Sequence, residues 1–257
     1  MVELRNLKYV SLVVLFVIFL VAWWLFVDSS HRMGSHGSDI YPADLIMRIM
    51  MDPTSKVSSY IPAAITMWAV MMLAMMMPAA VPLVLIFRKI YQADNLERDS
   101  LRLVFGFLMV WILFSTVAAI MQWGLHQNGF LGGKHFVVSN SLAGAIIFGA
   151  GLYQFSSFKD ACLSRCRSPL SFLMNNWDPV AGSAFRVGFH HGLFCLGCCW
   201  VLMLLMFAGG VMSVLTMAII SILILAERTL PGDRWIRLLP GFSLLGLGVY
   251  VWFFGGG

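Results

Sequence analysis

The stretch that decides the fold is Leu103-Val-Phe-Gly-Phe-Leu-Met-Val-Trp111-Ile-Leu-Phe-Ser-Thr-Val-Ala-Ala-Ile-Met-Gln-Trp123, which contains no Asp, Glu, Lys or Arg. A helix needs about 20 consecutive apolar residues to cross the hydrocarbon layer of a bilayer. Because lipid surrounds such a helix, its side chains can be apolar on every face. The stretch therefore predicts a transmembrane helix.

Further apolar runs extend this interpretation to the whole chain, at 9–27, 62–87, 140–158, 187–208, 211–226 and 239–254. Of the 257 residues, 60% are hydrophobic and only 11% are charged, whereas about a quarter of the residues in a soluble domain are charged. We therefore expect an all-α, polytopic transmembrane helical bundle of about seven spans. Residues 1–61 would form an N-terminal helix and an outer-face segment, and residues 62–257 a six-helix metal-binding domain.

The basic residues predict an orientation. Thirteen of the 17 Lys and Arg residues fall in links on one side of the predicted membrane, and four fall on the other. Positively charged links stay in the cytoplasm, so the N-terminus is expected inside and the C-terminus outside a plasma membrane, the bacterial inner membrane. The same distribution explains the net charge of +5. It makes the lipid bilayer, and not nucleic acid, the expected partner.

One predicted span carries a dense group of soft metal ligands. It begins Gly188-Phe-His-His-Gly-Leu-Phe-Cys195-Leu-Gly-Cys-Cys-Trp200. On a helix, His191, Cys195, Cys198 and Cys199 lie within an arc of about 100°. Imidazole and thiolate ligands select Cu(I), Zn(II) or an iron–sulfur cluster. Free cysteine also packs well as a small apolar residue, but three cysteines beside His190 and His191 favour a metal site.

A second predicted span is rich in methionine, with six Met residues between Met67 and Met77. Met67, Met71 and Met75 follow one another at every fourth position and therefore share a helix face. Thioethers bind Cu(I) and bind Zn(II) poorly, so Met71 and Met75 favour copper, with zinc as the alternative. The competing interpretation is that methionine, a pliable side chain, only fills the core.

Two further cysteines, Cys162 and Cys166, follow the predicted span 140–158 and are four residues apart. They share a face if this stretch is helical, and neighbouring Lys and Arg residues would favour their thiolates. The predicted topology places them at the same side of the membrane as His190 and His191. A joint cysteine and histidine site is therefore geometrically feasible, although two incidental thiols would show the same spacing. Glu227 is expected to form a structural ion pair with Arg228 or Arg186.

Several of these stretches together match a known family. They are Trp68-Ala-Val-Met-Met-Leu-Ala-Met75-Met-Met-Pro78 with Pro82, Gly151-Leu-Tyr-Gln154, Cys162-Leu-Ser-Arg-Cys166-Arg-Ser-Pro169, His191-Gly-Leu-Phe-Cys195-Leu-Gly-Cys-Cys-Trp200, Gly209-Gly210 and Ala226-Glu227. In these motifs the chain resembles a bacterial family of predicted metal-binding integral membrane proteins, a domain of unknown function. The resemblance covers roughly residues 62 to 254. It implies a multi-span fold with a metal site at the Met, Cys and His positions, and it implies no reaction.

Three hypotheses follow for the function. The first is an integral membrane protein that handles copper by binding it, passing it on or delivering it to a partner, either a membrane protein or a metalloenzyme complex. The second is a membrane redox metalloenzyme, although enzymatic activity is the less favoured interpretation. The third is a structural or assembly subunit of a larger membrane complex, in which the cysteine and methionine side chains only pack.

Overall fold

The computed structural model describes residues 56–91, 96–132, 137–176, 183–211, 213–230 and 234–255, together with 17, 20, 21, 23, 24, 27, 46, 49 and 50. Most of the predicted first span, 9–27, therefore lies outside the described residues. Of its described part, Trp23 is helical and donates a hydrogen bond from its indole Nε1 to the backbone oxygen of Ala74 at 3.0 Å. The N-terminal segment thus contacts the methionine-rich helix.

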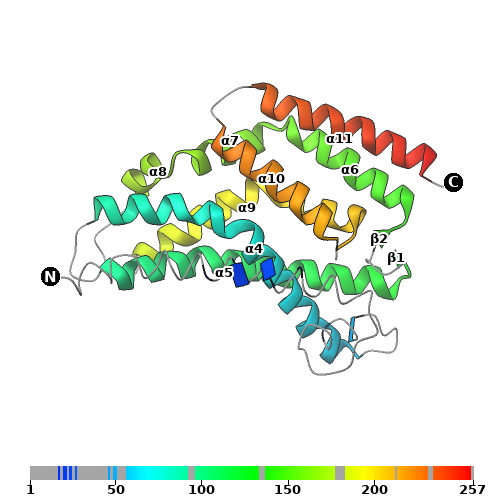
Figure 1. Ribbon diagram of the computed structural model, residues 1–257, viewed down its shortest axis with the longest axis horizontal. Coiled ribbons are helices and arrows are strands. Elements are labelled where there is room, and N and C mark those ends of the chain that lie inside the picture. Colours follow the sequence, from blue (N-terminus) through cyan, green and yellow to red (C-terminus); the bar gives the residue numbers. More distant parts are fainter. Residues whose placement is uncertain are drawn as a thin grey trace.

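The described chain is helical throughout, apart from one short hairpin, which confirms the all-α class (Figure 1). The helices are α4 (Val57–Ile90), α5 (Leu96–Gln127), α6 (Asn140–Gln154), α7 (Ser157–Arg167), α8 (Pro169–Asn176), α9 (Ser183–Gly209), α10 (Val214–Thr229) and α11 (Arg234–Phe254). The hairpin pairs β1 (Leu131–Gly132) with β2 (Val137–Val138) in antiparallel fashion. It joins α5 to α6.

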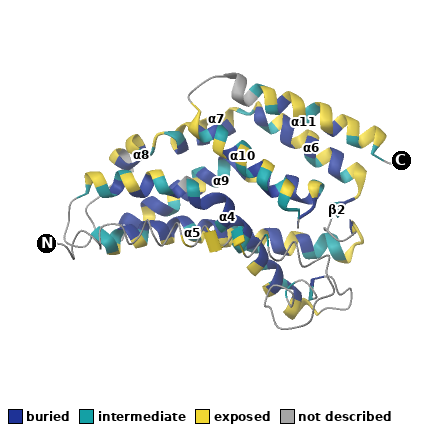
Figure 2. Cartoon of the chain, viewed as in Figure 1, coloured by how far each residue is buried: buried dark blue, intermediate teal, exposed yellow. Residues whose placement is uncertain are grey.

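The bundle is built from helix pairs. Helix α11 packs along α6, α5 packs along both α4 and α9, and α7 lies across α9 (Figure 1). The side chains between these helices are buried, whereas the outer faces of α5, α10 and α11 carry exposed Leu, Ile, Val and Phe side chains (Figure 2). An apolar outer surface of this kind is expected where lipid is the surrounding solvent.

Close approach of α5 and α9 depends on glycine. A Cβ atom on Gly188 would lie 1.9 Å from the backbone oxygen of Leu103, and one on Gly106 would lie 2.2 Å from that of Phe185. Small residues let membrane helices come into backbone contact in this way. Gly188 and Gly192 therefore contribute to packing, while the residues around them carry the predicted ligands.

A bend between α6 and α7 redirects the chain toward α9. The two helices meet at an angle of 66° across Phe155 and Ser156. Ser156 caps the new helix, because its Oγ accepts a hydrogen bond from the backbone N–H of Phe158 at 3.2 Å. Serine at an N-cap satisfies one of the free amide groups at a helix start. The bend places α7 against α9 instead of continuing the axis of α6.

The turn between α9 and α10 is tight. Gly210 has a φ of 97°, a conformation that glycine adopts without a steric penalty. Thr216 closes the turn by donating from Oγ1 to the backbone oxygen of Gly209 at 2.8 Å. Helix α10 therefore begins only a few residues after the end of α9.

Helices lie at each of the predicted spans after residue 57, but they differ in length. Among the described residues, three helices are long and apolar enough to cross a membrane: Val57–Pro78 within α4, Leu96–Gln127 and Ser183–Gly209. The bent pair of α6 and α7 adds a fourth if it forms one span. The prediction of about seven spans therefore exceeds the three or four that meet this criterion.

Candidate metal centre

The predicted ligands of α9 lie on one buried face of that helix. His191, Cys195, Cys198 and Cys199 are each at most 2% exposed. The Cys198 and Cys199 thiols both donate to the backbone oxygen of Cys195, at 3.0 Å in each case. Side chains three and four residues apart are neighbours on a helix, so these bonds hold three sulfur atoms within about one turn.

Helix α7 adds further thiols to this group. The Cys166 side chain is buried in the same cluster as those of Cys195 and Cys198, where α7 packs against α9. Cys162 contacts the same helix, because a Cβ atom on Gly197 would lie 2.8 Å from its Sγ. The structure thus brings Cys166 together with the cysteines of α9, and it places Cys162 one helical turn away on α7. All five cysteines are free thiols.

An arginine from α10 lies directly against these sulfur atoms. The Arg228 guanidinium donates from Nη2 to Cys195 Sγ at 2.7 Å, and Cys198 Sγ lies 3.6 Å from the same nitrogen. Sequence reasoning had assigned Arg228 only as a partner for Glu227. No periodicity or spacing connects residue 228 to α9, so this contact was missed.

Glu227 has a different partner from the two predicted. It forms a buried ion pair with Lys159, whose Nζ lies 2.7 Å from Glu227 Oε2. The Gln154 amide donates to the other carboxylate oxygen at 2.8 Å, and Arg167 donates from Nε to the backbone oxygen of Glu227 at 2.7 Å. The prediction of a pair with Arg228 or Arg186 is therefore wrong, and the ion pair of Glu227 joins α10 to α7.

The two adjacent histidines have different surroundings. His191 is buried beside the rings of Phe107 and Phe172, with ring centroids 6.2 and 5.4 Å away, and its Nδ1 has no hydrogen-bond partner among the described residues. His190 faces a separate open cavity of about 760 Å³, which Cys162, Arg165 and Phe194 also line. The Nδ1 atom of His191 is available as a ligand, whereas His190 lines a different cavity from the one in which the inner thiols are buried.

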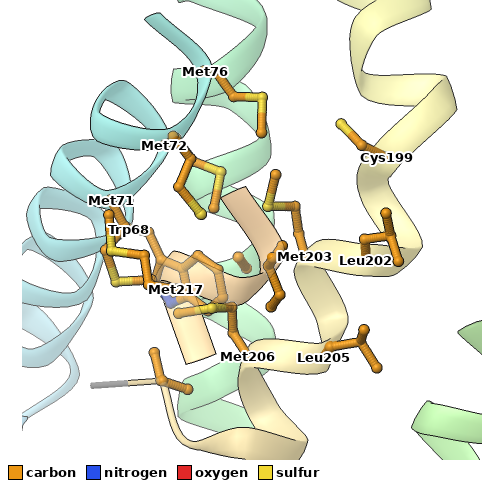
Figure 3. Packing of buried hydrophobic residues seen from close by; sticks show 14 of the residues in the cluster. Trp68, Met71, Met72, Met76, Cys199, Leu202, Met203, Leu205, Met206 and Met217 are labelled. Carbon is orange, nitrogen blue, oxygen red and sulfur yellow. The ribbon is translucent and has the colours of Figure 1, made fainter. Parts of the chain in front are cut away.

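Methionines gather next to the thiols, along the continuation of α9. Figure 3 shows side chains from α4, α9 and α10 converging around Trp68. We call this set the methionine group: Met71, Met72, Met76, Met203, Met206 and Met217, all buried. Met71 belongs to it, whereas Met75 lines a cavity of about 190 Å³ beside Arg228. The sequence did not predict most of these methionines, because on a helix that is apolar on every face the pattern does not indicate which way a methionine side chain points.

The donor set fits a soft metal ion. Thiol, thioether and imidazole groups meet here, and the Glu227 carboxylate in the neighbourhood is already paired with Lys159. Such donors suit Cu(I) and Zn(II) and not Mg²⁺ or Ca²⁺. Within the described part of the chain, no three His, Cys, Asp or Glu side chains surround one point as metal ligands. The guanidinium of Arg228 lies against the sulfur atoms instead.

Comparison with known proteins gives one match. No curated protein and no solved structure matches this chain. The sequence pattern of one family, PpoB2, described as a copper chaperone, matches residues 65–251. The matched range contains α5 to α10, all five cysteines and the whole methionine group. The chain therefore belongs to the PpoB2 copper chaperone family.

Proposed function

We propose that this protein is an integral membrane copper chaperone, which binds Cu(I) at its buried thiols and delivers it to a partner protein. The observation that carries the proposal is the burial of Cys166 from α7 in one cluster with Cys195 and Cys198 from α9. Thiolates are ligands that Cu(I) prefers, and the ion can pass between them by exchange of one sulfur for another. His191, one helical turn from Cys195, would be a further ligand.

The open cavity of about 760 Å³ supplies an entrance for the ion in this proposal. Cys162 and His190 line the cavity, and Cys166 lies four residues further along α7, buried in one cluster with the inner thiols. Copper arriving from a carrier would first bind Cys162 and then move through Cys166 to Cys195 and Cys198. Cys162 and Cys166 would thus form the exchange pair.

The methionine group supports copper over zinc. Cys199, Met203 and Met206 follow one another along α9, so sulfur atoms continue from the thiols into the methionine group (Figure 3). Thioethers bind Cu(I) but are poor ligands for Zn(II). In the proposal Met71 and Met203 are secondary ligands, and Met75 is a candidate through the cavity that it shares with Arg228.

The proposed setting is the bacterial inner membrane. Three helices of sufficient length and the exposed apolar side chains of α5, α10 and α11 support insertion. We propose seven spans, with 9–27, α10 and α11 completing the set, the N-terminus inside, and the domain division at residues 61 and 62. This orientation would open the entrance cavity toward the cytoplasm, so copper would be collected there.

A second candidate function is thiol redox chemistry in the membrane. It is favoured by the contact between Arg228 and Cys195, since a neighbouring cation stabilises the reactive thiolate form. Cys195 and Cys198 also have the spacing of a dithiol pair. Oxidation of the purified protein followed by mapping of disulfides by mass spectrometry distinguishes the two functions, because a copper chaperone needs no Cys195–Cys198 disulfide during its cycle.

The test of the proposal is the copper content of protein purified in mild detergent without chelator, measured by elemental mass spectrometry. We expect stoichiometric copper in the wild type and its loss in the Cys195→Ser/Cys198→Ser/Cys199→Ser variant. Met109→Leu is the matched control, because Met109 is a sulfur-containing residue on the outer face of α5. Equal copper in the wild type and the triple variant would refute the thiol site.

A further inference from the structure

The position of Arg228 suggests a role beyond holding the helices together. Its Nη2 contacts Cys195 Sγ at 2.7 Å and lies 3.6 Å from Cys198 Sγ, while its buried Nε has no hydrogen-bond partner within the part of the chain that the structure describes. The side chain also borders the cavity of about 190 Å³ that Met75, Pro78 and Ser221 line. That volume is several times the ~30 Å³ of a water molecule, so the guanidinium has space to shift while it stays near the sulfur atoms.

The net charge at the buried thiols depends on this arginine. An arginine side chain stays protonated in proteins, and cysteines lose their protons when they bind a metal. Arg228 contacts the Cys195 and Cys198 sulfur atoms. With these two cysteines as thiolates and Cys166 and Cys199 keeping their protons, the thiolates and the guanidinium together carry one net negative charge. The nearby Lys159 and Glu227 form an ion pair that cancels itself. A monovalent ion therefore makes the two thiolates and the guanidinium neutral as a group, whereas a divalent ion leaves one positive charge, which is costly in a buried site.

We propose that Arg228 determines the metal preference of this site, by setting a charge that a monovalent soft ion balances and a divalent ion does not. The inference rests on the proposed function, because it takes Cys195 and Cys198 as the thiols that bind copper. In the loaded state the guanidinium moves from between the two sulfur atoms toward the adjoining cavity. There it stays close enough to neutralise the bis-thiolate complex.

The experiment compares Cu(I) and Zn(II) affinities of the reduced protein in detergent, by competition with chelators of known affinity. Arg228→Met removes the charge, Arg228→Lys retains it, and Arg102→Met removes an arginine from the start of α5 as a matched control. We expect the ratio of Cu(I) to Zn(II) affinity to fall at least about tenfold in Arg228→Met. The ratio should remain near the wild-type value in Arg228→Lys and in the control.

The possible outcomes distinguish the role of Arg228 from the proposed copper-binding function on which it rests. A wild type that binds no copper would refute both. A wild type that binds copper, with an unchanged ratio in Arg228→Met or an equal fall in Arg228→Lys, would refute the role of Arg228 alone. Should the variants fail to fold, the wild type still provides a test with Ag(I) and Cd(II), which are soft ions of different charge. Preference for Cd(II) over Ag(I) would overturn the inference.

Discussion

Lys159 and Glu227 form an ion pair across 2.7 Å although their side chains are only 0% and 3% exposed. The pair fixes the end of α10 to the start of α7. Since Arg228 follows Glu227 directly and Cys162 and Cys166 lie on α7, the pair also sets the relative position of the guanidinium and the thiols. Its loss is therefore expected to affect both stability and metal binding.

Replacing either partner should destabilise the protein strongly. Lys159→Met leaves the Glu227 carboxylate buried without its counter-ion, a change that typically costs about 3–5 kcal/mol. The double variant Lys159→Met/Glu227→Met should cost less than the sum of the two single variants. The measurement is the free energy of unfolding in detergent. Arg102→Gln, which breaks the more exposed pair with Asp99, is the control and should cost about 1 kcal/mol or less. Additive single-variant effects would contradict the coupling.

The contact between α5 and α9 should not tolerate a methyl group. In Gly188→Ala the new Cβ would meet the Leu103 backbone oxygen at 1.9 Å, so the helices must separate. We expect a loss of at least about 1–3 kcal/mol, together with reduced copper binding, since the same helix carries Cys195. Thermal unfolding in detergent provides the measurement. Gly124→Ala in α5 is the matched control, because a Cβ at that position meets nothing within 4 Å. A Gly188→Ala variant as stable as Gly124→Ala would be inconsistent with the packing.

A polar network in the bundle core should be costly to interrupt. Trp68 donates from Nε1 to Gln122 Oε1 at 2.6 Å, and Gln122 donates from Nε2 to the Tyr60 hydroxyl at 3.2 Å. Gln122→Leu leaves the buried indole N–H without an acceptor, which costs about 1–3 kcal/mol. Chemical unfolding followed by tryptophan fluorescence measures the change. Thr116→Val, at a half-buried position on α5, should have little effect. Equal stability of the two variants would argue against the network.

The proposed entrance role of Cys162 has a kinetic signature. Cys162→Ser should leave the amount of bound copper unchanged, because the Cys195 and Cys198 thiols remain. It should slow loading from a Cu(I) carrier several-fold, since the first sulfur ligand is missing. Stopped-flow measurement of uptake provides the rate, and equilibrium copper content is the internal control. Loss of copper at equilibrium would instead place Cys162 among the main ligands.

Part of this architecture follows from the sequence. Long apolar runs predict the positions of the helices, and helical periodicity predicts that His191, Cys195, Cys198 and Cys199 share a face. The bend at Phe155 and Ser156 could not be predicted in the same way. No Pro or Gly stands at the break, and Phe155 and Phe158 on either side of Ser156 and Ser157 led the predicted span to include the whole stretch up to residue 158.

Contacts between distant helices were harder still to predict. The methionine group combines Met71 and Met72 with Met203, Met206 and Met217. A helix that is apolar on every face gives no indication of which face meets protein and which meets lipid. Arg228 was assigned to its sequence neighbour Glu227, because ion pairing within one helix end is the simplest use of two opposite charges. The thiols that actually receive its hydrogen bond come from another helix.

The 66° bend between α6 and α7 gives the two helices different neighbours in the bundle. A straight helix would rise 1.5 Å per residue and carry Cys166 about 18 Å beyond Gln154, away from the other cysteines. Because of the bend, α6 packs along α11 while α7 packs against α9 and brings Cys166 into the cluster of buried cysteines. Under the proposed function, membrane insertion and copper binding would therefore depend on different helices, so that substitutions in α7 could change the metal site while the packing of α6 on α11 is kept.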